Sequence, residues 1–124
     1  IASTDACNKM VQPDIYDNYK QMLRQESGKT IVFVSDDKIT GTYGCGTANC
    51  KADVAKNFFA KLQEIDVDGF FSPTTKLQHG VMVHSIDGHD CMGEPGRANS
   101  YTYKGLADQT GGTNFELCQT DWTP

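Results

Sequence analysis

The sequence predicts an α+β fold in which a twisted antiparallel sheet packs on a helix. Three observations lead to this expectation: helical periodicity is confined to the first half of the chain, strand-like patterns follow from Phe70 onward, and five cysteines are spread along the length. At 124 residues, with 38% hydrophobic and 22% charged side chains, the chain suits one core. We therefore expect a single domain, residues 1–124, with an N-terminal helix, a β-hairpin and disulfide staples.

Two helices are expected in the first half of the chain. Over residues 13–28 apolar side chains recur at helical spacing, Pro13 suits the first turn, and Gly28 suits the end. Over residues 51–65 a wider apolar stripe predicts a helix with one face in the core. The sequence Asp-Val-Asp-Gly at 66–69 predicts a turn that ends this second helix.

Strands are expected on both sides of the second helix. Residues 30–35 are β-branched and apolar, which indicates a buried strand, and residues 38–43 follow an Asp-Asp turn as its hairpin partner. In the second half, residues 81–86 alternate most clearly, and residues 99–104 place two tyrosines on one side. Residues 114–119 are expected to form a short closing strand. Together these strands predict the antiparallel sheet.

The cysteines indicate disulfides rather than a metal site. Structural zinc sites show close C-x2-C pairs, whereas the nearest pair here, Cys45 and Cys50, has four residues between its members. Scattered cysteines in a small chain are typical of an oxidising compartment, and the chain starts at Ile1 without an initiator methionine, as mature secreted proteins do. We expect a secreted, extracellular protein with one cysteine unpaired, because the count is odd, and with the pairing left open.

Charge and hydropathy exclude several classes of function. The formal net charge of -5 has the wrong sign for a protein that binds nucleic acid through many phosphate contacts. The longest apolar run, residues 31–34, is far shorter than the roughly 20 residues of a membrane-spanning helix. No glycine motif for phosphates or dinucleotides occurs, and His79 and His84 fall on opposite faces of a strand, where they cannot share a metal. We expect no cofactor, no metal and no membrane contact.

Two residues in the second half are candidates for chemistry. His84 lies in the middle of an apolar strand, and an imidazole there can serve as a general acid or base, or as a structural hydrogen-bonding group. Arg97 follows the Pro-Gly turn at 95–96, and its guanidinium can hold a phosphate in a bidentate manner. The alternative for Arg97 is a surface ion pair with Glu94 or Asp90.

The segment from Val81 to Cys118 resembles the small secreted fungal ribonucleases of the guanyl-preferring type and their sarcin-like ribotoxin relatives. The resemblance rests on an Asp-Gly-His-Asp turn at 87–90, a Pro-Gly-Arg turn at 95–97, a Tyr-Thr-Tyr segment at 101–103, and a closing Asn-Phe segment that ends in a cysteine. It covers about a third of the chain.

The resemblance implies that part of a ribonuclease site is present. Arg97 matches the strand arginine of the family, and Phe115 matches the phenylalanine that lines the site. In the family the last cysteine bridges to one near the N-terminus, and here Cys7 or Cys45 would fill that role for Cys118.

The family's catalytic pair is missing from the matching positions. The base glutamate would fall near Val81 or Val83, neither of which accepts a proton, and the acid histidine would fall in residues 108–111, which contain none. Cleavage through a 2′-OH needs a base and an acid, and losing either costs on the order of 10²–10⁴ in rate. The resemblance therefore implies a non-catalytic, monomeric effector of the virulence or toxin type, which binds a host protein or RNA.

Two alternatives stay open. An active secreted ribonuclease or ribotoxin would use His84, Arg97 and Phe115, with His79 or Glu116 as a further catalytic group. An unrelated disulfide-stabilised module, such as a killer-toxin-like protein or an inhibitor, would share only the cysteines. An RNA-cleavage assay tests the first alternative, and mapping of the disulfides tests the second.

Overall fold

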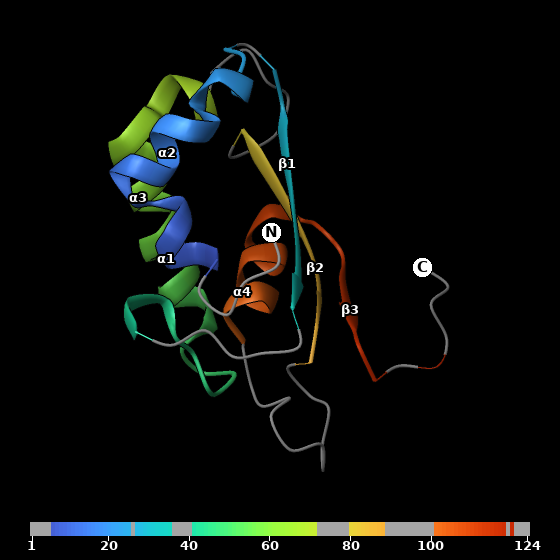
Figure 1. Ribbon diagram of the computed structural model, residues 1–124. Helices are drawn as coiled ribbons and strands as arrows, with labels where there is room; N and C mark the ends of the chain where they lie inside the picture. The colour runs from blue at the N-terminus through green and yellow to red at the C-terminus, as the bar shows by residue number, and fades with distance from the viewer. Residues whose placement is uncertain are drawn as a thin grey trace.

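The computed structural model contains a sheet of three parallel strands (Figure 1). It describes residues 6–25, 27–35, 41–71, 80–88, 101–118 and 120. The strands in these residues, in their order across the sheet, are β1 (Lys29–Ser35), β2 (Val81–Asp87) and β3 (Asn114–Glu116). β1 pairs with β2 and β2 pairs with β3, both in parallel, which places Lys29 opposite Val81 and Ser85 opposite Asn114.

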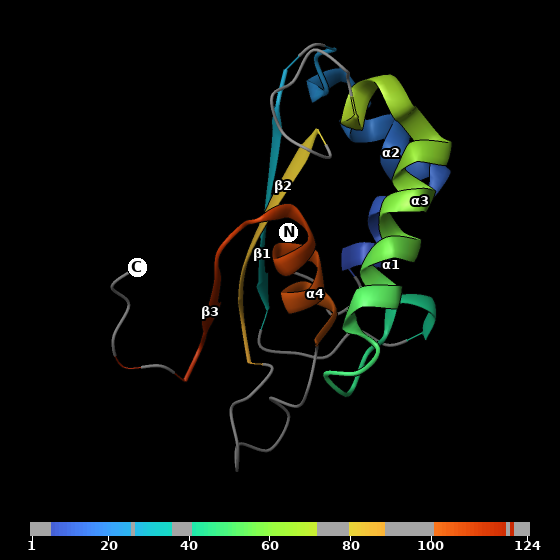
Figure 2. The same cartoon turned by 180° about the vertical axis from the view of Figure 1, so that it is seen from behind.

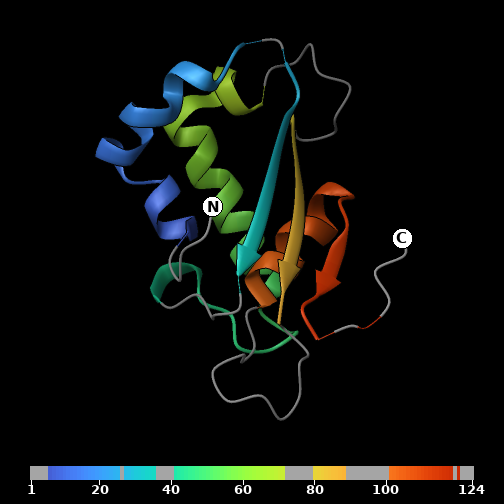
Figure 3. The same cartoon turned by 45° about the vertical axis from the view of Figure 1, so that its right-hand side comes forward.

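The described helices lie on one side of this sheet, as Figures 1 and 2 show from opposite directions. They are α1 (Ala6–Met10), α2 (Pro13–Tyr19), α3 (Lys51–Phe70) and α4 (Tyr101–Thr110), with the 3-10 turns η1 (Lys20–Met22) and η2 (Gly41–Tyr43). α4 packs on β2 (Figure 3), and α3 packs on α4 on the side away from the sheet (Figure 2). Within the described ranges no helix combines the length and the apolar character that a membrane crossing needs.

The prediction of a twisted antiparallel sheet is wrong, because the sheet is parallel. Parallel neighbours need a crossover of a dozen or more residues, and α3 and α4 lie in the two crossovers. The predicted hairpin of residues 30–35 with the segment at 38–43 is not found among the described residues, where β1 pairs with β2. In that segment residues 38–40 lie outside the described residues, and Gly41–Tyr43 form η2.

The strand expected at 99–104 is wrong for its described part, because residues 101–104 begin helix α4, while residues 99 and 100 lie outside the described residues. Tyr103, Leu106 and Ala107 are fully buried, and their spacing is the helical one. The two tyrosines of the segment alternate over a window shorter than two helical turns, so they do not distinguish a strand from a helix. The buried positions Leu106 and Ala107, three and four residues after Tyr103, are what distinguish the helix from a strand.

Most other elements are confirmed with changed ends. The strands expected at 30–35 and 81–86 are present, and each is one residue longer. The helix expected over 13–28 is shorter: α2 ends at Tyr19, and the 3-10 turn η1 follows it directly. The closing strand is confined to the three residues of β3. The sequence does not predict α1, because five residues are too short to show a helical period.

α3 bends at Asp66, where the backbone leaves helical geometry with φ -158° and ψ 83°. The Asp66 carboxylate accepts the N–H of Gly69 at 2.8 Å and the hydroxyl of Tyr16 at 2.6 Å. It therefore caps the turn that follows and ties α2 to α3. The turn predicted at 66–69 is present as a bend within the helix, which continues to Phe70.

We expect Tyr16→Phe to weaken the alkaline dependence of stability. The hydrogen bond to Asp66, together with burial and the charge of Asp66, raises the pKa of Tyr16 from 10.0 to about 12. A pKa raised in the folded state contributes stability that is present below pH 10 and lost as the pH rises toward 12. Because Tyr16 is partly exposed, its removal should cost about 1 kcal/mol near neutral pH.

Urea denaturation at about pH 8 and about pH 11 measures this effect. Tyr19, whose pKa burial also raises to about 12, leaves part of the alkaline dependence in place. If the loss of stability between the two pH values is the same in Tyr16→Phe as in the wild type, the hydrogen bond to Asp66 has no role in it.

The core lies between the sheet and the helices. Phe33 of β1 packs on Tyr103 of α4 with ring centroids 4.9 Å apart, and both side chains are fully buried. Phe58 of α3 meets Tyr43 edge-on at 5.4 Å. Such aromatic pairs contribute about 0.5–1.5 kcal/mol beyond the area they bury. The apolar stripe of the second helix is thus confirmed as a core face.

A disulfide joins Cys45 to Cys50, whose Cα atoms lie 5.8 Å apart. It closes the turn directly before α3, because Cys50 is the residue that precedes the helix. Cys7 is a buried thiol. The pairing implied by the ribonuclease resemblance is therefore wrong, since neither Cys7 nor Cys45 is bonded to Cys118.

Candidate functional site

The site residues predicted from the sequence are brought together only in part. His84 lies in β2, and Phe115 of β3 is in register with Ile86, so the side chains of His84 and Phe115 share one face of the sheet. Arg97 lies outside the described residues. Nδ1 of His84 accepts the backbone N–H of Thr113 at 2.9 Å, a structural contact that holds the start of β3 against β2.

RNA cleavage would require a second catalytic group beside His84. Glu116, the carboxylate considered for that role, follows Phe115 on β3 and therefore points to the opposite face of the sheet. His79, the other group considered, lies outside the described residues. These candidate groups do not form an acid–base pair around His84 in the part of the chain that the structure describes.

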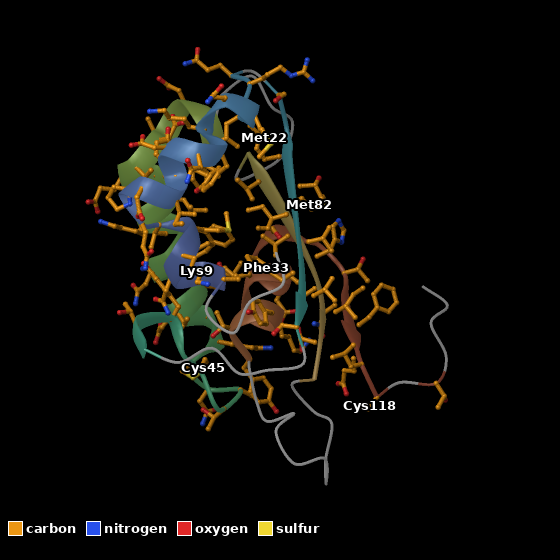
Figure 4. All side chains as sticks on the ribbon, viewed as in Figure 1. Lys9, Met22, Phe33, Cys45, Met82 and Cys118 are labelled. Carbon is orange, nitrogen blue, oxygen red and sulfur yellow. A yellow bond between two sulfur atoms is a disulfide. The ribbon has the colours of Figure 1, made fainter. Side chains whose placement is uncertain are left out.

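The face that carries His84 points away from the described helices. Figure 4 shows Phe33 directed toward the helices and Met82 on the other side of the strands. We call this second side the open face, and it consists of Thr30, Val32, Val34, Met82, His84, Ile86 and Phe115. Val32 and Val34 are each 45% exposed. Parallel sheets are almost always covered on both faces, so these valines mark a surface that is usually buried in α/β proteins.

β1 also has one edge without a partner strand among the described residues. The N–H of Lys29 donates to the carbonyl of Gly80 at 3.2 Å, and successive peptide groups of a strand point alternately to its two sides. Ile31 and Phe33 therefore also bond toward β2. The N–H and C=O groups of the intervening residues point to the other side, which we call the free edge: Thr30, Val32 and Val34.

Beside the free edge lies a cavity of about 680 Å³, which we call the β1 groove. This volume is typical of ligand sites in proteins. Its floor is the first half of β1, from Lys29 to Val32. Its apolar walls come from α1, α2, η1, the residue after η1 and the last residue of α3, chiefly Met10, Ile15, Tyr19, Leu23 and Phe70.

The walls of the β1 groove are held by contacts within the protein. The Tyr19 hydroxyl donates to the carbonyl of Met10 at 2.6 Å. The Tyr19 ring lies edge-on to Tyr16 at 5.5 Å and to Phe70 at 6.5 Å between centroids. Burial raises the pKa of Tyr19 from 10.0 to about 12, so this phenol remains a hydrogen-bond donor even at moderately alkaline pH. These contacts preform the groove before any ligand arrives.

Basic side chains line the groove together with these apolar walls. Lys29 is only 8% exposed, and its ammonium donates to the carbonyls of Arg24 and Ser27 and to the Ser27 hydroxyl. Burial lowers the pKa of Lys29, although the charge of Asp66 acts in the opposite direction. Lys9 and Arg24 are exposed at the groove. No acidic residue is among the described residues that line it.

A polar cluster lies at the carboxyl ends of the strands, on the helix-covered face. Asn114 donates from Nδ2 to the Ser85 hydroxyl at 2.5 Å and to the Asp87 carboxylate at 2.8 Å. Asp87 is 1% exposed and Ser85 is fully buried. Open α/β sheets often bind ligands outside this end, but here the donors of Asn114 serve to hold β3 against β2.

Sequence reasoning missed the β1 groove and the free edge. The one signal for them is the unbroken apolar run at 31–34, which is typical of a parallel strand covered on both faces. The interpretation of this run as half of a hairpin places a partner strand at the outer edge of β1, where the structure has none among the described residues.

Comparisons of the chain with protein-family models, with curated proteins and with solved structures find no match. The β1 groove and the free edge are therefore the features of the described residues that bear on function.

Proposed function

We propose that this chain is a non-catalytic binding module that captures an extended segment of a partner protein at the free edge of β1. The segment adds to the sheet as a further strand. Its backbone bonds to the peptide groups of Thr30, Val32 and Val34, and its alternate side chains enter the β1 groove. The observation that supports this function best is the position of the groove, which lies directly against the first half of β1, a strand whose outer edge has no partner among the described residues.

Strand addition fits the chemistry of the edge. In this mode of recognition main-chain hydrogen bonds supply affinity and pockets for alternate side chains supply specificity. Proteins that avoid such pairing place lysines, prolines or bulges on their edge strands. β1 has none of these at its outward positions, where Thr30, Val32 and Val34 stand instead.

The same features favour a protein over RNA as the partner. RNA binding draws on rows of basic groups for the phosphates and on exposed aromatic platforms for the bases. The open face as defined has no Lys, Arg, Asp or Glu, and the chain as a whole carries a net charge of -5. A strand edge of uncharged residues, next to a groove that has apolar walls and three basic side chains, matches an extended polypeptide better than a row of phosphates.

The extracellular setting expected from the cysteines remains part of this proposal. The Cys45–Cys50 disulfide supports it, because such bonds persist mainly in oxidising compartments. A secreted effector that binds a host protein would use the free edge in this way.

A selection from displayed random heptapeptides tests the proposal with Val32→Pro. Proline removes the outward N–H of Val32 and places its ring where an added strand would bond, while the bonds between β1 and β2 stay intact. We expect the wild type to enrich peptides with alternating apolar residues, and Val32→Pro to bind them at least about tenfold more weakly. Amide hydrogen exchange should show protection of the Thr30 and Val34 N–H groups when a selected peptide binds.

Val32→Thr is the matched control, since it keeps the N–H and the β-branched shape at the same position. We expect it to bind the selected peptides as the wild type does. The proposal fails if no peptide is enriched, or if Val32→Pro binds as tightly as Val32→Thr. It also fails if the chain occupies its own edge, which would appear as a dimer in sedimentation that Val32→Pro dissociates, or if an RNA oligonucleotide competes with the peptides.

A further inference from the structure

We infer that the segment captured at the β1 groove is acidic, with at least one Asp or Glu among apolar residues, and that Lys9 and Arg24 select it. This inference rests on the proposed function and names the chemistry of the partner. It comes from the distribution of ion pairs over the surface of the chain.

The basic side chains of the described part divide into two groups. The first group forms ion pairs with carboxylates of the chain: Lys20, Lys51, Lys61 and Lys104. Lys9 and Arg24 form no ion pair with a described residue, and both line the β1 groove. Outside the groove, Lys56 is the one described basic residue that forms no ion pair with a described carboxylate. The chain carries a net charge of -5. Its described and exposed cations that have no described carboxylate partner nevertheless lie mainly at the β1 groove.

Lys29 strengthens the positive potential of this site. Lys29 itself lines the groove, and its ammonium donates to neutral oxygens of Arg24 and Ser27. Asp66 is the acidic group that acts on it, and the oxygens of Asp66 already accept hydrogen bonds from Tyr16 and Gly69. The charge of Lys29 is therefore not neutralised by a direct carboxylate contact among the described residues.

Apolar walls and basic groups together define the partner more narrowly than either feature alone. A wholly apolar segment would fill the groove but gain nothing from Lys9 and Arg24. A basic segment would be repelled by three cations. Complementary charges at such a rim act mainly on specificity and on the rate of association, so an acidic and apolar segment is the one that the site distinguishes.

The test uses the same heptapeptide selection on charge variants of the full chain. Lys9→Gln with Arg24→Gln removes both exposed charges and keeps the backbone carbonyl of Arg24 that Lys29 uses. Lys56→Gln is the matched control, because it removes an exposed lysine that forms no ion pair with a described residue and lies outside the groove. On the wild type we expect Asp and Glu to be enriched about fivefold over Lys and Arg. The enrichment should persist in Lys56→Gln and vanish in the double variant.

A synthetic pair completes the test: the leading selected peptide, and the same peptide with Gln in place of each acidic residue. We expect the acidic peptide to bind the wild type about fivefold more tightly at low salt, and the difference to shrink as salt is raised. If both peptides bind equally but Val32→Pro still abolishes binding, the inference is overturned and the proposed function stands. Decanoate, a small apolar carboxylate, tests whether the groove binds a lipid-like molecule instead. If decanoate displaces the peptides while Val32→Pro leaves peptide affinity unchanged, both the inference of an acidic segment and the proposed function are overturned.

Discussion

Gly112→Ala is expected to lower the free energy of unfolding by about 3 kcal/mol or more. A Cβ at Gly112 would stand 1.7 Å from the carbonyl oxygen of Val83 and 2.7 Å from its carbonyl carbon. These are backbone atoms of the central strand, so no side-chain rotation relieves the clash. The Gly112 N–H also donates to the carbonyl of Ala107 at 3.0 Å, and moving the backbone would break this bond at the end of α4. Urea denaturation followed by circular dichroism measures the loss.

Two other glycines serve as controls for this prediction. A Cβ added at Gly46 would meet nothing within 4 Å, and the residue has no positive φ, so Gly46→Ala should change stability by less than about 0.5 kcal/mol. Gly111 has equal space but a φ of +70°, so Gly111→Ala should cost about 1 kcal/mol through the backbone alone. If Gly112→Ala is no less stable than Gly46→Ala, β3 does not approach β2 as the structure has it.

The elements that could be predicted from the sequence are those with a local pattern of sufficient length. In α3 the apolar positions Val54, Phe58 and Leu62 repeat over more than two helical turns, and all are buried as expected. In β2 the side chains alternate between buried and half-buried along most of the strand. Both patterns reflect which face of the helix or strand is buried, and the spacing of apolar residues along the sequence indicates that face directly.

The direction of the strands could not be predicted in the same way. Strand pairing depends on what lies between the strands, and the alternation of the first tyrosines of α4 favours a strand there. Once 101–110 is a helix, the order of the main elements becomes strand, helix, strand, helix, strand, which is typical of a parallel sheet. One wrong element therefore changes the predicted fold class.

The candidate site was harder to predict than the fold. His84 stands out in the sequence because an imidazole has distinctive chemistry, and in the structure it holds β3 in place through Thr113. Val32 and Val34 have no distinctive chemistry, and they matter because β1 has no further described strand beside them. The β1 groove joins Met10, Leu23 and Phe70, whose segments lie far apart in the sequence, so it exists only in the folded chain.

Ile31→Pro is expected to lower the free energy of unfolding by about 3 kcal/mol or more. The register places the N–H of Ile31 toward β2, and proline both removes this donor and pushes its ring against the neighbouring strand. Ile31→Ala separates the two causes, because it removes the half-buried side chain and keeps the N–H. We expect Ile31→Pro to be clearly less stable than Ile31→Ala in urea denaturation.

Val32→Pro, one residue further along, should cost only about 1 kcal/mol, because its N–H points to the free edge and the ring meets solvent there. The contrast between the two proline variants therefore reports which side of β1 is bonded, independently of any partner. If Val32→Pro were as destabilising as Ile31→Pro, β1 would have neighbours on both sides in the folded chain. Strand addition would then be impossible, and the groove beside β1 would lose the edge on which the proposed recognition depends.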